Sequence, residues 1–180
     1  QYKLMAQPII EALESGEDIN HNAELSANLA LINKACEQMK NELKDLTQTL
    51  LNQGKKVVLL GGDHSTPLGY YEAMATKHDS FGILHLDAHM DLRIAYEGFT
   101  YSHASIMYNA LQIPQISKIV QVGIRDFCEQ EVEVANNDRV AVFTDADLKA
   151  ETFEGVTWEK QCEKIINALP QKVLVSFDID

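Results

Sequence analysis

From residue 56 onward, the sequence alternates between short apolar runs rich in β-branched residues and longer runs with helical periodicity. This alternation is typical of βαβ units, whose strands lie parallel in one sheet. The strands are almost continuously apolar, which indicates that helices cover both faces. We expect strands at residues 56–60, 81–86, 118–122, 139–143 and 172–177, and helices at 67–77, 103–111, 128–136 and 157–169. The sequence therefore predicts a three-layer α/β fold with a mostly parallel sheet.

One long helical pattern precedes the first expected strand. Between residues 22 and 53, apolar residues recur in alternating steps of four and three, which predicts a helix with a single apolar stripe. Asn22 can cap its start and Gly54 can end it. A coiled coil is the alternative for such spacing, but uncharged residues occupy flanking positions where coiled coils favour complementary charges. We expect a long helix that lies on the sheet.

The size and composition of the chain fit one domain. Its 180 residues are 46% hydrophobic, which is enough for a single core. No internal repeat, low-complexity segment or flexible linker indicates a second domain. We therefore expect residues 1–180 to form one α/β domain, and the start at Gln1, without an initiator methionine, favours an excised piece of a longer chain.

The charge balance and the cysteines narrow the classes of partner and the compartment. Acidic residues outnumber basic ones 27 to 15, and a net charge of −12 disfavours nucleic acid or an anionic membrane surface as a partner. A cationic or metal partner fits better. Three widely spaced cysteines without a Cys-x-x-Cys pair indicate a reducing cytoplasm. No apolar run approaches the roughly 18 residues that span a membrane.

Polar clusters directly follow three of the expected strands. They read Gly-Gly-Asp-His-Ser at 61–65, Asp-Ala-His-Met-Asp at 87–91 and Asp-Ile-Asp at 178–180. In open parallel sheets, ligands bind outside the carboxyl ends of the strands. We therefore expect these clusters to bring four carboxylates and two imidazoles to one edge of the sheet. The six residues are His64, Asp87, His89, Asp91, Asp178 and Asp180.

These side chains are typical of a metal site. Alternate residues of an extended segment point the same way, so Asp87, His89 and Asp91 can converge. Carboxylates packed this closely repel one another unless a cation lies between them. Oxygen and imidazole ligands without a thiolate suit Mn, and less selectively Fe, Co, Ni or Zn, and the set is too large for one tetrahedral zinc. Two ions ~3.5 to 4 Å apart can activate a shared water near neutral pH, which indicates hydrolysis.

Each cluster alone also has an ordinary structural explanation. A single Asp-x-His or Asp-x-Asp is commonly a solvated loop or a helix cap, and Gly61-Gly62 fits a tight turn from strand to helix. A phosphate cradle is the alternative there, but the P-loop spacing is missing and no Lys follows closely. His85 lies inside the apolar strand, where we expect a structural role. The occurrence of three clusters at three strand ends favours the metal site.

The three clusters resemble, in order, the three signature motifs of the ureohydrolase family, which comprises arginase, agmatinase and formimidoylglutamase. The third motif reads Ser-Phe-Asp-Ile-Asp at 176–180. The resemblance runs from about residue 56 to the last residue, and family members continue through further strands. It implies that residues 1–180 are the N-terminal part of a longer, arginase-like ureohydrolase domain. It also implies a homo-oligomer, a trimer or a hexamer.

The resemblance further implies two Mn²⁺ ions per subunit at the carboxyl edge of the sheet. The ligands of one ion would be His64, Asp87, Asp91 and Asp178, and those of the other would be Asp87, His89, Asp178 and Asp180. Asp87 and Asp178 would bridge the two ions. Asp63 and Ser65 would support and orient the ligands.

The implied reaction is attack of a metal-bridging hydroxide on a guanidinium or formimidoyl carbon, and a guanidino substrate would give urea and an amine. Asp91 would help transfer the proton to the departing amine. His103, within Tyr-Ser-His-Ala-Ser at 101–105, would shuttle a proton or contact the substrate.

The identity of the substrate is less constrained. His103 favours a guanidino substrate, whereas Asp91-Leu92-Arg93 resembles formimidoylglutamases and some agmatinases. Residues 93–99 do not resemble the loop with which arginases grip an α-amino acid. We expect a small cationic substrate and an agmatinase-like activity, with formimidoylglutamase second and arginase third.

Two other classes are alternatives. Zinc deacetylases also use Asp-x-His at a strand end, although they need neither two Asp-rich clusters nor Gly-Gly-Asp-His-Ser. A metal-binding pseudoenzyme would keep the site for structure or assembly. Arg125 fits a structural position of the ureohydrolase family and, equally, an exposed salt bridge.

Overall fold

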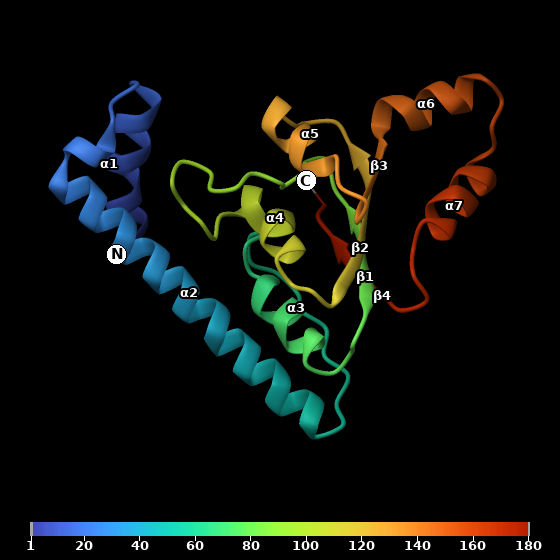
Figure 1. Cartoon of the computed structure of the whole chain (residues 1–180), viewed down its shortest axis with the longest axis horizontal. Helices are drawn as coiled ribbons and strands as arrows, with labels where there is room; N and C mark the ends of the chain where they lie inside the picture. Colours follow the sequence, from blue (N-terminus) through green and yellow to red (C-terminus); the bar gives the residue numbers. More distant parts are fainter. Residues whose placement is uncertain (1, 180) are drawn as a thin grey trace.

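The computed structural model describes residues 2–179 and places a four-stranded parallel sheet at the centre of the molecule (Figure 1). In chain order the elements are α1 (Tyr2–Glu14), η1 (Ile19–His21), α2 (Ala23–Asn52), α3 (Leu68–Ala75), β1 (Phe81–Leu86), η2 (His103–Ser105), α4 (Ile106–Leu111), β2 (Ile116–Ile124), α5 (Glu129–Ala135), β3 (Val140–Thr144), α6 (Asp145–Phe153), α7 (Trp158–Asn167) and β4 (Val173–Phe177). No helix in this part of the chain is long and apolar enough to cross a membrane.

The strand order is β3-β2-β1-β4, so β1 lies between β2 and β4. β1 pairs in parallel with β2 on one side and with β4 on the other, and Leu86 lies opposite both Val122 and Phe177. The pairing continues just past the strands, because the amide of Asp178 donates to the carbonyl of Leu86 over 2.9 Å. The shared register brings the residues after β1 and β4 to one edge of the sheet.

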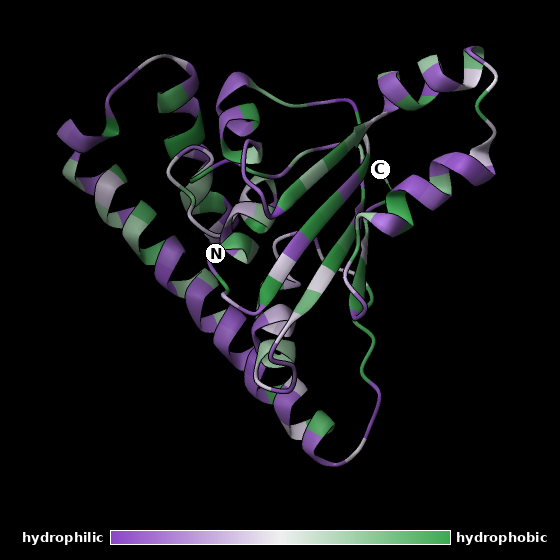
Figure 2. Cartoon of the chain, turned by 45° about the vertical axis from the view of Figure 1, so that its right-hand side comes forward, coloured by the Kyte–Doolittle hydropathy of each residue, from purple (hydrophilic) through white to green (hydrophobic). Residues whose placement is uncertain are grey.

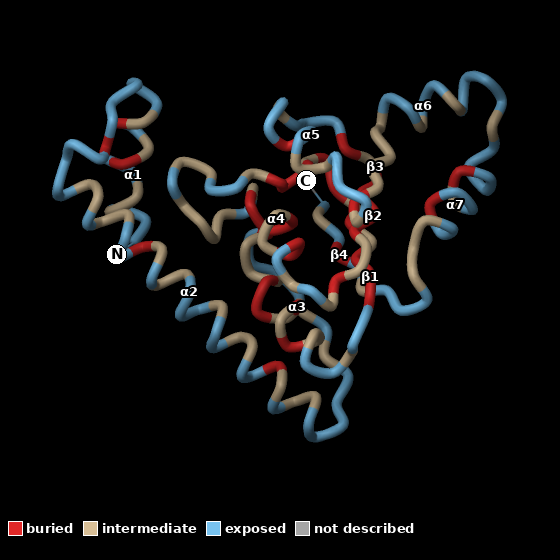
Figure 3. Tube along the Cα trace, viewed as in Figure 1, coloured by how far each residue is buried: buried red, intermediate tan, exposed pale blue. Residues whose placement is uncertain are grey.

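Helices cover both faces of the sheet, as the apolar strands predict (Figures 1 and 2). On one face, Ile83 and Ile119 pack with α3 and α4 in the main core. On the other face, Val120 and Val122 form a cluster with buried Ile165 of α7 and with the partly buried Leu148 of α6. Buried residues concentrate in β1 and β2 and in α3 and α4 (Figure 3). The fold is the predicted three-layer α/β arrangement.

The long helix α2 has almost the predicted limits, but it does not lie on the sheet. The side chain of Asn22 caps it, accepting from the amides of Glu24 and Leu25 at 3.2 Å each. The first half of its apolar stripe packs against α1 and η1 in a small separate core that contains Ile9 and Ile32. The second half packs on α3, which stands between α2 and the sheet (Figure 1). The expectation of direct contact with the sheet was wrong because α1 and α3 cover the stripe.

The predicted strand at residues 56–60 is also wrong. The segment pairs with no described strand, and the side chains of Val58 and Leu60 are 88% and 96% exposed. A groove of about 710 Å³ separates it from β4, whose Val175 and Phe177 are themselves exposed. Apolar, β-branched residues favour extended backbone, but a strand also needs a partner for its hydrogen bonds.

The other predicted elements are found close to the expected positions. β1 has the predicted limits, and α3, α5 and α7 begin and end within two residues of them. Residues 103–111 form the 3₁₀ turn η2 followed by α4. The sequence did not predict α1 or α6. Thr144 caps α6 by accepting from the amide of Asp147 at 3.0 Å, a Thr-x-x-Asp signal that is visible in the sequence.

The packing of α3 on α2 depends on Gly69. A Cβ at this position would collide with the carbonyl oxygen of Lys40 and lie 3.2 Å from the Cβ of Leu43, both on α2. In an open helix, Gly→Ala stabilises by about 1 kcal/mol. We expect Gly69→Ala instead to lower the free energy of unfolding by about 1–3 kcal/mol, because the two helices must separate. Urea denaturation measures the sign, and a gain in stability would contradict the close packing.

Glu72 on α3 bridges two lysines of α2, with 2.9 Å between its carboxylate oxygens and the Nζ atoms of Lys40 and Lys44. Burial raises the pKa of Glu72, but the hydrogen bonds from both lysines outweigh it and lower the pKa. The stabilisation is therefore present above the ordinary carboxyl pKa of about 4.3 and is lost as the pH falls through the lower pKa of the folded state.

We expect Glu72→Gln to cost about 1 kcal/mol at pH 7, since both ion pairs are partly exposed. The difference from the unmodified protein should begin to shrink below about pH 4.3 and should vanish once the pH has fallen through the lowered pKa of folded-state Glu72, where the wild-type carboxylate is protonated as well. Thermal melts across this range test the expectation. The exposed Glu163 of α7 offers a matched Glu→Gln control that should change little at any pH.

Candidate metal centre

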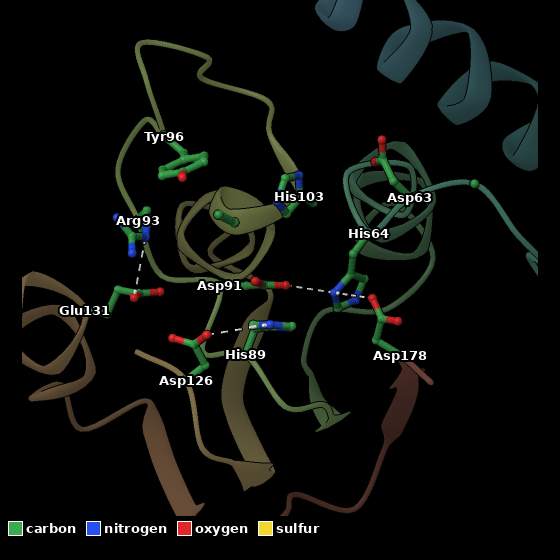
Figure 4. A pocket seen from close by; sticks show the side chains of 12 residues that line it. Asp63, His64, His89, Asp91, Arg93, Tyr96, His103, Asp126, Glu131 and Asp178 are labelled. Carbon is green, nitrogen blue, oxygen red and sulfur yellow. Dashed lines mark hydrogen bonds and ion pairs between the residues drawn. The ribbon is translucent and has the colours of Figure 1, made fainter. Parts of the chain in front are cut away.

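Three chain segments bring a histidine and three carboxylates together at the carboxyl edge of the sheet, and Figure 4 shows His64, Asp91 and Asp178 of this group. The Nδ1 atom of His64 lies 2.8 Å from Asp91 Oδ2, 3.1 Å from Asp87 Oδ2 and 3.5 Å from Asp178 Oδ2. His64, Asp87 and Asp91 are buried, and Asp178 is half-buried. The structure thus unites four of the six residues that the sequence indicated as metal ligands.

The other two predicted ligands are placed differently. The amide of His89 donates to Asp87 Oδ1 over 2.7 Å, and its ring lies 3.4 Å from the same oxygen. On its other side, His89 Nε2 lies 4.0 Å from Asp126 Oδ2. The ring is therefore beside the cluster around His64 and faces a second acidic residue. Asp180 lies outside the described residues.

The segment after β1 is shaped so that its polar residues face the site. Met90 and Leu92 are buried in the core, on either side of Asp91. Asp91 has a φ of +56°, and its carbonyl oxygen accepts from the amides of Met107 and Tyr108 in α4, at 3.0 and 3.2 Å. This left-handed conformation is uncommon for a residue other than glycine and is held by tertiary contacts. The alternation of apolar and acidic residues aims Asp91 at His64.

The electrostatics of the cluster favour a cation. Burial lowers the pKa of His64, but its hydrogen bonds to Asp87 and Asp91 outweigh burial and raise the pKa to about 9. Burial raises the pKa of Asp87, yet the hydrogen bonds from His64 and His85 hold it well below its usual range. In the metal-free protein, therefore, the His64 imidazole carries an extra proton at neutral pH, and metal binding at His64 would release it.

The donor set fits a divalent metal ion. One ring nitrogen carries at most one hydrogen, whereas three carboxylate oxygens surround Nδ1 of His64. That proton cannot pair with all three, so further positive charge among them would be favourable. The donors are oxygen and imidazole nitrogen without thiolate, a set that suits Mn²⁺ and related ions. The residues present are therefore compatible with the metal that the sequence predicts.

Hydrogen bonds on the other side of the ring, at Nε2, also hold His64 in place. Its Nε2 lies 2.9 Å from the Oγ of Ser176, which also accepts from the hydroxyl of Tyr71 over 2.7 Å. Tyr71 and Ser176 are buried, and burial raises the pKa of Tyr71 well above its usual range, so its hydroxyl remains a donor. Metal-binding histidines typically donate their other ring N–H in this way. Sequence reasoning assigned neither residue this role.

Asp63 and Ser65 stabilise the turn that carries His64. The Oδ1 of Asp63 accepts from both the amide and the hydroxyl of Ser65. Neither side chain hydrogen bonds to His64, Asp87 or Asp91 among the described residues. The support of the ligands that was predicted for Asp63 and Ser65 would therefore act through the backbone of the turn.

A pocket of about 500 Å³ opens over the cluster, and the predicted residue His103 lies on its wall (Figure 4). His103 is exposed, and its ring stands edge-on to that of Tyr96, with 6.2 Å between the centroids. The loop that carries both residues is tied to α2, because Asn33 donates to the carbonyl of Gly98 and accepts from the amide of Thr100, at 3.0 Å each. Helix α2 thereby helps to place His103.

The pocket also contains residues that sequence reasoning did not assign to the site. Arg93 lies 4.8 Å from the centroid of the Tyr96 ring, and its Nε is 3.7 Å from buried Glu131 of α5. Glu131 also accepts from the amides of Leu92 and Cys128. It therefore couples the start of α5 to the segment after Asp91. A Glu three residues after the helix cap is a capping signal in the sequence, but its contact with Leu92 is not.

Arg125 does not take part in the pocket. Its side chain is exposed, and its Nη1 lies 3.5 Å from the carbonyl of Gly123, while its amide donates to the carbonyl of Ala88 over 2.8 Å. The backbone contact, not the guanidinium, links this residue to the segment that carries Asp87.

Similarity to known proteins identifies the family of this chain. The family profile described as the Arginase family matches residues 9–180, nearly the whole chain. The chain belongs to the arginase family. An N(1)-aminopropylagmatine ureohydrolase of Thermus thermophilus is 35% identical over 130 residues, which are 72% of this chain and 41% of that relative. The agmatinase of Bacillus anthracis is 33% identical over 93 residues, 52% of this chain and 32% of that enzyme.

The likeness of this arginase-family chain extends to solved structures. The agmatine ureohydrolase of Thermoplasma volcanium superimposes with a TM-score of 0.63 at 24% identity, over 78% of this chain and 45% of that one. At this identity the superposition shows the fold. The matches span less than half the length of each of these relatives.

We expect Mn²⁺ to stabilise the protein, because the carboxylates around His64 converge only in the folded state. At 100 times the dissociation constant, the free energy of unfolding should rise by about 2.7 kcal/mol, and EDTA should reverse the gain. Thermal melts with and without Mn²⁺ measure the effect. Asp91→Asn should weaken it, whereas the same change at exposed Asp79 should not. An equal shift in both variants would place the bound ion elsewhere.

Proposed function

We propose that this protein is a Mn²⁺-dependent ureohydrolase of the agmatinase type, which cleaves a guanidino C–N bond to give urea and an amine. The observation that carries the proposal is the convergence of Asp87, Asp91 and Asp178 on one nitrogen of His64, at the floor of a pocket that His103 lines. Membership of the arginase family and the names of the similar proteins support it.

The proposed centre holds two Mn²⁺ ions per subunit. The proposed ligands are His64, Asp87, His89, Asp91, Asp178 and Asp180, with Asp87 and Asp178 shared. Metal ions held there would lower the pKa of water and so supply the nucleophile for hydrolysis of the guanidino C–N bond near neutral pH. The His89 ring lies beside Oδ1 of Asp87, whereas His64 lies beside Oδ2, and this arrangement is compatible with a second ion next to the first.

The chain's own residues would handle the protons and the substrate. Asp91, with Oδ2 directed at the centre of the cluster, would hold a proton and pass it to the nitrogen of the departing amine. His103 is exposed on the pocket wall, so its ring can exchange protons with solvent and contact the substrate. The ring of Tyr96 beside it limits the orientations of His103.

The charge of the pocket favours a small cationic substrate. Besides the cluster, Asp63, Asp126 and Glu131 line it, while Arg93 is the only Lys or Arg among the described lining residues. Arg93 is 3.7 Å from Glu131, so its charge is largely compensated. Agmatine and aminopropylagmatine, the compounds in the relatives' names, are cations that suit such a pocket. Arg93 is the feature that keeps formimidoylglutamate, an anion, as the second candidate, and arginine is third.

The proposal includes a cytoplasmic homo-oligomer, a trimer or a hexamer, on the strength of the family resemblance. Nucleic acid and membranes are not proposed as partners, given the net charge of −12. Light scattering coupled to size-exclusion chromatography tests the oligomeric state.

A substrate comparison tests the proposed function. The Mn²⁺-loaded protein is incubated with agmatine, aminopropylagmatine, arginine or formimidoylglutamate, and urea or formamide is assayed. The guanidino amines should give the highest kcat/KM. Absence of turnover with two metal ions bound would contradict the hydrolase proposal and favour a metal-binding pseudoenzyme.

His103→Ala should lower kcat by about 100-fold or more, the range usual for loss of a general acid or base. Its metal content should stay unchanged, because no metal candidate contacts His103 among the described residues. Steady-state kinetics and metal analysis on the same sample check both points. His21, which is exposed far from the site on η1, provides the His→Ala control. Loss of metal in His103→Ala would contradict the assigned role.

A further inference from the structure

Two polar residues are completely buried beneath the carboxylate cluster. His85 of β1 and Gln121 of β2 are register partners on neighbouring strands, and both are 0% exposed. They lie on the sheet face that carries Ile83 and Ile119 of the main core. Polar side chains are costly in such a place unless they are hydrogen bonded, so the pair needs an explanation.

The contacts of Gln121 fix the orientation of its amide. One amide atom lies 2.6 Å from the carbonyl oxygen of Met90 and 2.9 Å from Nδ1 of His85. A carbonyl oxygen only accepts, so the atom facing it must be the NH₂ group. The opposite orientation would set two acceptor oxygens against each other. The chosen orientation holds even though Oε1 of Gln121 is then buried without a partner among the described residues.

This orientation determines the tautomer of His85. The NH₂ group of Gln121 has two hydrogens, one for the carbonyl of Met90 and one for Nδ1 of His85. Nδ1 therefore accepts, and the ring hydrogen is on Nε2. Nε2 lies 2.8 Å from Asp87 Oδ2 and donates to it. Both ring nitrogens are thus engaged, so His85 is not free to ligate a metal, although it lies within the buried His/Asp group.

We propose that Gln121 and His85 form a positioning pair that sets the carboxylate of Asp87 for metal binding. His85 donates to Oδ2 and the amide of His89 donates to Oδ1, so both oxygens of Asp87 are held from the protein side. On the site side, Oδ2 lies 3.1 Å from Nδ1 of His64 and Oδ1 lies 3.4 Å from Nδ1 of His89. Through the carbonyl of Met90, Gln121 also holds the backbone next to Asp91. This inference rests on the proposed metal centre.

Metal affinity tests the pair without reference to catalysis. Gln121→Met keeps the volume but removes the donor, which frees the His85 ring to change tautomer. We expect the dissociation constant for Mn²⁺, measured by isothermal titration calorimetry and by the EPR signal of free Mn²⁺, to rise roughly 10- to 100-fold. Buried Gln161 of α7 provides a matched Gln→Met control, in which Mn²⁺ affinity should not change. Unchanged affinity in folded Gln121→Met, or an equal loss in the control, would overturn the proposal.

A measurement on the unmodified, metal-free protein does not depend on whether a variant folds. Long-range ¹H–¹⁵N NMR spectra should show His85 with an unprotonated Nδ1 and a protonated Nε2, with the ring resonances assigned by through-bond correlation to the His85 backbone. A hydrogen on Nδ1 would overturn the proposed pair even if the protein binds Mn²⁺ and turns over substrate. Conversely, failure to hydrolyse any substrate, with Mn²⁺ affinity sensitive to Gln121, would reject the proposed reaction and leave the positioning pair supported.

Discussion

Mutual repulsion of the carboxylates around His64 is the constraint on which the rest of this structure depends. Asp87, Asp91 and Asp178 approach a single ring nitrogen within 3.5 Å, in a largely buried place. Such an arrangement is unfavourable unless positive charge lies within it. The protonated ring of His64 supplies some of that charge, and a divalent ion would supply more. The surrounding hydrogen bonds hold each side chain in place against the repulsion.

The fold meets this constraint by the register of its strands. Parallel pairing of β1 with β4 sets Asp178 beside Asp87, and α4 holds the left-handed turn at Asp91 through two amides. His64 is held by Ser176 and Tyr71, and His85 holds Asp87. The ligands therefore come from segments whose relative positions are set by the sheet and by the buried polar contacts behind it. A rigid frame of this kind is what a functional site requires.

Much of this arrangement could be predicted from the sequence, because it follows from short-range patterns. Strand limits follow from apolar runs, and the clustering at one edge follows from parallel topology. Residues 56–60 could not be predicted correctly, because their apolar pattern does not reveal whether a partner strand lies beside them. The roles of Tyr96 and Gln121 depend on contacts between distant segments. For Tyr96, the contact is the hydrogen bond from Asn33 to Gly98, which places the loop of Tyr96. For Gln121, it is the pairing of β1 with β2.

The exposed segment at residues 56–60 has a consequence for the exchange of a bound ion. It leads directly into the turn of His64, and its described ties to the body include one hydrogen bond, from the hydroxyl of Tyr70 to the carbonyl of Val57 over 3.0 Å. Weakly held segments open more often than the core. Opening here would withdraw the imidazole from all three carboxylates at once. The residence time of a bound ion would then be set by the rate at which residues 56–60 open locally. It would not be set by the successive loss of single ligands.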